Sequence, residues 1–465
     1  MKLPKLFFAA SLVAVGAACG READVALGHL PAAGRGAGGG TLLRIPQDGG
    51  TPRLYRLPSL NPSTWKTEDK LPPLQRTIGA DGDAGLAFFL DRKRNTVVLD
   101  LETRRVRPQL EHVRQAAVGP DGALYAVDTG SMVTQLIRRA PVRYRSKLQG
   151  KPDVLYATMG GTLLGRIEGK SPAIEVLGSD QPPEMIPTPA GPTVTSFWGD
   201  LIAVAADTGI ILYEAGGKHE RSSFPVSGHA RAVLFSPSGH RIYVARDEGG
   251  LLVVDRFSRG KLFDVDLPGP ARGLRSDPYG QWLLIRPADG DSAWVVDVAT
   301  GRLTGTANVK WDEDLPAIMP PGILLTRRGG KVVALDLGAK GFPERGSLES
   351  AAGDTWLPLA WQPAQEAGPS VEADSALLAV DADSGKGAAS VFLQVSSSQN
   401  PSWANELSER LKAAGLPASV LQPRRSDEAY RVVLGPYATR EQAEETGRKI
   451  GMPSFIVTAQ DPPAR

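Results

Sequence analysis

Few residues of this 465-residue chain have the type and spacing that covalent or metal chemistry needs. Cys19 is the single cysteine, which excludes a disulfide framework and any site built from several thiolates. No two histidines have the spacing of a metal-binding pair such as H-x-x-H; the five are His29, His112, His219, His229 and His240. No G-x-S-x-G elbow presents a nucleophile. We therefore expect no catalytic residue, no metal and no cofactor.

The first residues have the pattern of an export signal. Lys2 and Lys5 precede an apolar run of about ten residues, Leu6–Val15, which is too short to span a bilayer. Small residues follow at 16–18, directly before Cys19. The segment resembles a bacterial lipoprotein signal peptide. The resemblance implies that residues 1–18 are removed and that Cys19 is lipidated, whereas an ordinary secretory signal is the alternative.

The same resemblance bears on location. Gly20 follows Cys19, whereas lipoproteins retained in the inner membrane of some bacteria have Asp at that position. We therefore expect a lipid anchor in the outer membrane and a protein that faces the periplasm. Residues 19–40 are rich in Gly and Ala, which predicts a flexible tether. The net charge is +2, which argues against nucleic acid as a partner.

Short β-rich runs separated by Gly, Pro and Asp fill residues 41–386. Two stretches align 41 residues apart, Ala230–Gly239 and Ala271–Gly280, and each continues to an apolar run that ends in Asp, at Asp255 and Asp297. A period near 40 with strand–turn–strand units predicts a β-propeller with about four strands per blade. The length allows seven or eight blades, and we favour seven. The Asp residues are expected to bond the amides of the following turn.

This region is similar to the YVTN and WD40-like propellers of cell-envelope proteins. The resemblance implies that the loops on one face bind a protein partner. The tryptophans are expected in blade cores or rims; they are Trp198, Trp282, Trp294, Trp311, Trp356 and Trp361.

Residues 389–460 have β-α-β-β-α-β order. The expected strands are Val391–Val395, Ala418–Leu421, Tyr430–Leu434 and Ser454–Thr458. The first helix starts at Pro401 and stops at Gly415. Thr439 with Gln442 three residues later forms a capping box for the second helix.

This segment resembles a SPOR domain through Gln394–Ser397, Leu411–Gly415 and Tyr430–Thr439. That family binds peptidoglycan strands stripped of their stem peptides, and the resemblance implies roles for Gln394, Ser397 and Arg431. Because side chains alternate along a strand, Val433 shares a face with Arg431. An Arg can bind a carboxylate, such as the lactyl group of a stripped strand, with two hydrogen bonds. An RNA-binding sheet has the same strand order, but its stacking aromatic pair is missing here.

The sequence thus predicts a mainly β chain with four parts: a signal peptide (1–18), a tether (19–40), a β-propeller (41–386) and a small α+β SPOR domain (387–465). We expect a non-enzymatic lipoprotein of the periplasm, which binds peptidoglycan through Gln394, Ser397, Arg431 and Val433 and an envelope protein through its propeller, in cell division or wall remodelling. An envelope enzyme such as a peptidoglycan hydrolase and an assembly factor for outer-membrane proteins remain alternatives.

Overall fold

A computed structural model describes residues 40–363 and 391–458, apart from 82–84, 120–121, 138–139, 159–161, 179–181, 197–198, 200, 208, 215–220, 238, 240, 257–258, 278–279, 299, 320–321, 352, 360, 399–400, 414, 424–429, 441, 444–445 and 448–453. The expected signal peptide, Cys19 and the tether up to residue 39 lie outside the described residues, as does the stretch 364–390.

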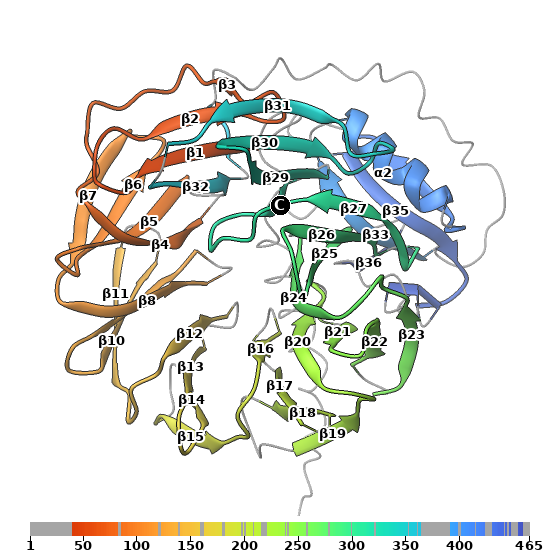
Figure 1. Ribbon diagram of the computed structural model, residues 1–465, viewed down its shortest axis with the longest axis horizontal. Coiled ribbons are helices and arrows are strands. Elements are labelled where there is room, and N and C mark those ends of the chain that lie inside the picture. The colour runs from red at the N-terminus through yellow and green to blue at the C-terminus, as the bar shows by residue number, and fades with distance from the viewer. Residues whose placement is uncertain are drawn as a thin grey trace, which may run out of the picture.

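The larger part of the molecule is a ring of four-stranded antiparallel sheets (Figure 1). One sheet takes its strands from both ends of the ring; in spatial order they are β3 (Asn61–Pro62), β2 (Arg53–Arg56), β1 (Thr41–Pro46) and β32 (Asp354–Leu359). The pairing of β1 with β32 runs from Thr41 opposite Leu359 to Pro46 opposite Asp354. The ring is therefore closed by a strand pair between distant parts of the sequence.

Every other sheet of the ring uses four consecutive strands, and the first strand of each lies toward the centre (Figure 1). These strands are β4 (Leu74–Asp81), β5 (Leu86–Asp91), β6 (Thr96–Asp100) and β7 (Arg105–Leu110); β8 (Val113–Val118), β9 (Leu124–Asp128), β10 (Met132–Ile137) and β11 (Ala140–Lys147); β12 (Val154–Ala157), β13 (Leu163–Ile167), β14 (Ala173–Leu177) and β15 (Glu184–Pro187); β16 (Thr193–Thr195), β17 (Leu201–Ala206), β18 (Gly209–Glu214) and β19 (Arg221–Pro225); β20 (Ala230–Phe235), β21 (Arg241–Arg246), β22 (Leu251–Asp255) and β23 (Lys261–Val265); β24 (Ala271–Ser276), β25 (Trp282–Pro287), β26 (Ser292–Asp297) and β27 (Arg302–Asn308); β28 (Ala317–Met319), β29 (Ile323–Arg328), β30 (Lys331–Asp336) and β31 (Glu344–Glu349).

The number of sheets corrects the favoured blade count. Within the described residues, the ring contains eight four-stranded sheets, so the structure supports eight blades instead of seven. The blade count expected from the sequence came from the length of residues 41–386 and a repeat period near 40. It also placed the end of the last blade near residue 386. In the structure, the last described strand of the ring is β32, which ends at Leu359 and completes the first sheet instead of starting a new one.

The core of the ring lies between neighbouring sheets. The middle strands of a sheet are buried on both faces, as every residue of β5 and of β22 is, whereas every residue of the outer strand β31 is exposed or half-buried. Leu284 of one sheet and Leu324 of the next belong to the same apolar cluster. Apolar runs such as those of β5 and β22 therefore form strands that are covered by a sheet on either side.

The turns of the repeat have the expected geometry. Gly239 donates its N–H to the carbonyl oxygen of Ser236 at 2.7 Å, with φ +71°, a conformation that favours glycine. At the end of β6, one carboxylate oxygen of Asp100 accepts the N–H groups of Glu102 and Thr103. The predicted role of Asp in the following turn is confirmed there.

The second domain contains one further four-stranded antiparallel sheet, in the order β34-β35-β33-β36. Its elements are β33 (Val391–Ser398), α2 (Pro401–Ala413), β34 (Ala418–Leu421), β35 (Tyr430–Tyr437) and β36 (Phe455–Thr458). Residues 442–443 and 446–447 are also helical. The expected order of elements is confirmed, and α2 begins at Pro401 as predicted.

Local contacts explain where the helices of this domain begin and end. Gly415 has φ +81° and donates to the carbonyl oxygen of Lys412, which ends α2. The side chain of Thr439 accepts the N–H of Gln442, and the side chain of Gln442 accepts the N–H of Ala438. The capping box therefore forms, with its second bond displaced by one residue.

Candidate functional site

The sheet of the second domain has one face against α2 and one face turned away from it. Val432 and Leu434 of β35 pack in an apolar cluster with Leu407 of α2. Because side chains alternate along a strand, Arg431 and Val433 face the other side. The sequence analysis had predicted this arrangement, with Arg431 and Val433 on one shared face.

The register of two strands brings the predicted peptidoglycan-binding residues to neighbouring positions. Along β33 and β35, Ser397 lies opposite Arg431, and Gln394 lies opposite Val433. The pairing is antiparallel and has an irregularity between Gln394 and Ser396. The four residues therefore share one region of the sheet, and their role in binding stays a prediction.

These residues differ in how much of them a ligand can reach. Val433 has no exposed surface and Gln394 is 5% exposed, whereas Arg431 is half-buried. A ligand on this face would therefore contact the guanidinium group of Arg431 before either of the other two. Val433 is out of a ligand's reach in this structure.

Two residues of β34 extend this face and were missed by the sequence analysis. Leu421 lies opposite Arg431, and Ser419 lies opposite Val433, both on the far side of β35 from β33. Both are half-buried. The alternation along Ala418–Leu421 was the available signal, because it places Ser419 and Leu421 on one face.

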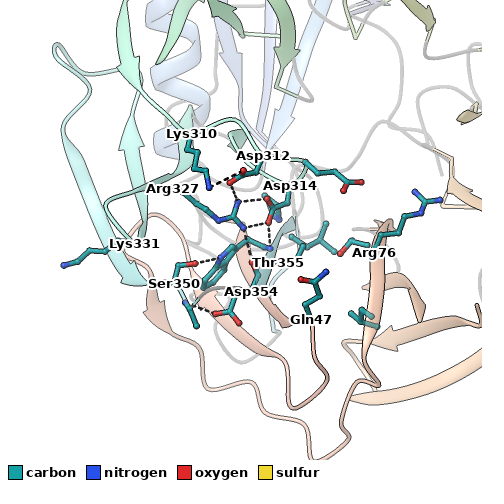
Figure 2. Close-up of a pocket in the computed structure, with 18 of the residues that line it drawn as sticks. Gln47, Arg76, Lys310, Asp312, Asp314, Arg327, Lys331, Ser350, Asp354 and Thr355 are labelled. Carbon is teal, nitrogen blue, oxygen red and sulfur yellow. Dashed lines mark hydrogen bonds and ion pairs between the residues drawn. The ribbon is translucent and has the colours of Figure 1, made fainter. Parts of the chain in front are cut away.

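The ring contains a second candidate site, a pocket of about 1010 Å³. It lies where the sheet of β28–β31 meets β32 and β4, and its rim is formed by the connections β27–β28, β29–β30 and β31–β32. These connections all lie at one edge of the ring, because successive strands of an antiparallel sheet alternate in direction. Figure 2 shows charged side chains from several of these segments gathered around the pocket.

Arg327 organises one wall of this pocket (Figure 2). Its guanidinium group donates to both carboxylate oxygens of Asp314, at 2.6 and 2.7 Å, and to Asp312 at 3.0 Å. It also donates to the carbonyl oxygen of Asp354. Burial by itself would lower the pKa of Arg327, but the hydrogen bonds to Asp314 and Asp312 outweigh burial and raise the pKa above its ordinary value.

The same network joins the last sheet of the ring to the first. Asp314 accepts the backbone N–H of Trp356 at 2.7 Å, across the boundary between the β27–β28 connection and β32. The side chain of Asp354 forms an ion pair with Arg44 of β1 at 2.7 Å. The wall is therefore fixed by the residues that close the ring.

The loop that carries the acidic residues is held from a second side. Arg275 of β24 donates to the carbonyl oxygens of Pro316 and Asp312, at 2.8 and 2.7 Å. Its guanidinium carbon lies 5.3 Å from the ring centre of Trp311, within the range of a cation–π contact. Burial lowers the pKa of Arg275 below its usual value. The loop is thus clamped between two arginines, Arg275 and Arg327.

Neither site has the side chains of a metal centre. Within the described residues, no group of three or more His, Cys, Asp or Glu side chains is arranged to hold a metal ion. The described part of the chain also lacks a helix long and apolar enough to cross a membrane.

Comparison with known proteins supports both parts of the fold. The SPOR domain family matches residues 387–458. The crystal structure of Citrobacter koseri AztD is similar to this chain with a TM-score of 0.50 at 12% identity, covering 69% of this chain and 98% of its own. Dihydro-heme d1 dehydrogenase NirN in complex with DHE has a TM-score of 0.47 at 15% identity, covering 67% of this chain and 75% of its own. Kluyveromyces lactis Hsv2 has a TM-score of 0.43 at 10% identity, covering 56% of this chain and 92% of its own. None of the curated proteins matches the chain.

The propeller likeness concerns fold alone, because the identity to AztD is 12%. The SPOR match says more, since a SPOR domain implies peptidoglycan binding and indicates a protein of the periplasm or cell envelope. Residues 387–458 of this chain are therefore a SPOR domain, and in the same chain they follow a β-propeller.

Proposed function

We propose that this chain is a non-enzymatic lipoprotein of the cell envelope that works in cell division or wall remodelling. Its lipidated Cys19 anchors it to the outer membrane, facing the periplasm. Its SPOR domain binds glycan strands stripped of stem peptides at division septa. Its propeller binds a partner in the envelope.

The observation that carries this proposal is the placement of Arg431 within the matched SPOR segment. Arg431 is the most accessible of the predicted residues whose exposure the structure describes, and Ser397 lies opposite it in the register. Removal of a stem peptide leaves a lactyl carboxylate on the strand, which a guanidinium group can bind with two hydrogen bonds. The side-chain amide of Gln394 is suited to the N-acetyl groups of the sugars.

Sedimentation of the purified full-length chain with sacculi tests the proposal. We expect more protein in the pellet after the sacculi are treated with an amidase that removes stem peptides, and we expect Arg431→Ala to abolish this gain. The matched control is Arg345→Ala, which removes an exposed arginine of β31 and should leave the gain intact. If Arg431→Ala pellets with amidase-treated sacculi as well as the natural chain does, the proposed glycan binding is wrong.

Two further assays address the remaining parts. Zymography on wall material should give no clearing band, because the proposal assigns no hydrolytic role; a band that persists after purification would overturn that part. Replacing Cys19 by Ala should release the protein from the membrane fraction. A Cys19→Ala chain that stays in that fraction would contradict the lipid anchor.

A further inference from the structure

The pocket at the edge of the ring has the size and the rigidity of a binding site. Its volume of about 1010 Å³ lies at the upper end of the range for ligand pockets, which is roughly 300–1,000 Å³. The wall that carries Asp312 and Asp314 is fixed by Arg327 on one side and by Arg275 on the other. A site that is already ordered loses little conformational entropy when a ligand binds.

The charges in its walls are equal in number but only partly paired. Five cationic and five acidic residues line it. Three of the acidic residues already form ion pairs. Asp312 pairs with Arg327 and Lys310, and Asp314 pairs with Arg327. Asp354 pairs with Arg44. Lys331 pairs with Glu349 and points away from the pocket (Figure 2).

Two cations and two carboxylates remain. Within the described residues, Arg76 and Arg328 donate only to the backbone carbonyl oxygens of Ala116 and Asn308. Within the described part of the chain, neither of these arginines forms an ion pair, and the same holds for the side chains of Glu313 and Asp291. The pocket therefore offers free groups of both signs to a ligand.

A buried hydroxyl group also lacks a partner there. The side-chain oxygen of Thr77, which lines the pocket on β4, is buried without a hydrogen-bond partner among the described residues. Gln47 and Thr355 add an amide and a second hydroxyl to the walls (Figure 2). The side chains of Gln47 and Thr355 can bond the amides of a peptide backbone, because each can donate and accept a hydrogen bond, whereas the buried oxygen of Thr77 is out of a ligand's reach.

We propose that this pocket binds the stem peptide of peptidoglycan. A stem peptide carries free carboxylates and, on its diamino acid, a free ammonium group, so it presents both signs of charge together with backbone amides. A neutral sugar would leave the charges of the pocket unpaired and partly desolvated. This inference rests on the proposed function, because the SPOR domain is what brings the pocket to peptidoglycan.

Calorimetric titration of the full-length chain with a soluble stem tetrapeptide that contains diaminopimelate tests the inference. We expect one peptide per chain, with the affinity reduced about tenfold or more by Arg76→Ala and by Glu313→Gln, since each removes a charged hydrogen-bond partner. Arg345→Ala and Glu344→Gln change exposed charges outside the pocket and should have no effect. If Arg76→Ala lowers the melting temperature, Arg328→Ala replaces it.

Modified peptides identify which charge meets which residue. A peptide with amidated carboxylates should bind the natural chain more weakly, and Arg76→Ala should weaken it no further. A peptide with an acetylated ammonium group should become insensitive to Glu313→Gln. The inference is overturned if the unmodified peptide does not bind, or if only a peptide of L-residues from a protein chain binds. It is also overturned if the losses of affinity from a substitution and from the matching peptide modification are additive.

Failure of this inference can be distinguished from failure of the proposed function. Arg431→Ala should leave peptide binding unchanged, since Arg431 lies in the other domain. Absence of peptide binding, together with amidase-dependent sedimentation, would overturn the pocket assignment alone. Peptide binding, together with undiminished sedimentation of Arg431→Ala on amidase-treated sacculi, would overturn the glycan assignment alone.

Discussion

Replacing Arg327 by Met removes the cation that holds the closing region of the ring. The side chain of Arg327 is 18% exposed and that of its main partner, Asp314, is 13% exposed. Loss of the guanidinium group leaves Asp314 with two bonds among the residues that the structure describes, from the N–H groups of Trp356 and Leu315. Asp312 keeps Lys310, whose ammonium nitrogen lies 3.6 Å away.

These contacts set the size of the effect. Removing one member of a buried ion pair costs about 3–5 kcal/mol, and a hydrogen bond to a charged group contributes about 1.5–3 kcal/mol. Because the pair is partly exposed, we expect Arg327→Met to lower the free energy of unfolding by about 3 kcal/mol. The coupling energy between Arg327→Met and Asp314→Asn should be about 2 kcal/mol.

A double-mutant cycle measured by urea unfolding and tryptophan fluorescence tests this reasoning. The matched control is the pair Arg345 and Asp336 on β31 and β30, which is also bonded twice but is 50% and 21% exposed. An exposed pair of this kind should couple by less than about 1 kcal/mol. Equal coupling in the two cycles would refute the idea that the Arg327 network stabilises the closure of the ring.

Three other substitutions probe the core, a titrating group and a turn. Leu324→Ala should lower the free energy of unfolding by about 2–5 kcal/mol, since Leu324 has no exposed surface. The same change at Leu262, which is 38% exposed, should cost far less. The midpoints of urea unfolding of the two variants test this difference. Burial raises the pKa of Tyr243 to about 12, so the stability that its neutral form contributes is complete below pH 10 and is lost as the pH rises toward 12. Melting temperatures of Tyr243→Phe should therefore fall less than those of the natural chain between pH 10 and 12. Gly191→Ala should destabilise the ring by more than about 1 kcal/mol, because Gly191 has φ +142° and its added Cβ would meet the carbonyl oxygen of Ala205; an unchanged melting curve would contradict this.

The sequence was most informative where structure depends on local pattern. The repeat around Ser236–Gly239 and the Asp at the end of β6 specify turns that the structure contains, because each depends on residues a few positions apart. The second domain was predictable for the same reason, since Pro401 and Gly415 mark the ends of α2. Strand alternation likewise placed Arg431 on the face away from α2.

The remaining features depend on residues far apart in the chain. No local signal shows that β32 pairs with β1, so the blade count stayed open between seven and eight. The pocket combines Arg76 with residues near 310 and 355, a combination that no spacing encodes. Alternation along a strand predicts to which face a side chain points, but not how much of that side chain solvent can reach. It therefore could not reveal that Val433 has no accessible surface.

The pairing of β1 with β32 also has a consequence for the order of biosynthesis. Arg44 and Asp354, which meet across this pair, are 310 residues apart. At roughly 5–20 residues per second, β1 is made about 15–60 s before its partner strand. During that interval one edge of β1 has unpaired N–H and C=O groups that can pair with another chain. A chain interrupted before residue 359 would retain this open edge and would also lack the SPOR domain, so incomplete products would be prone to aggregate and unable to bind the wall through that domain.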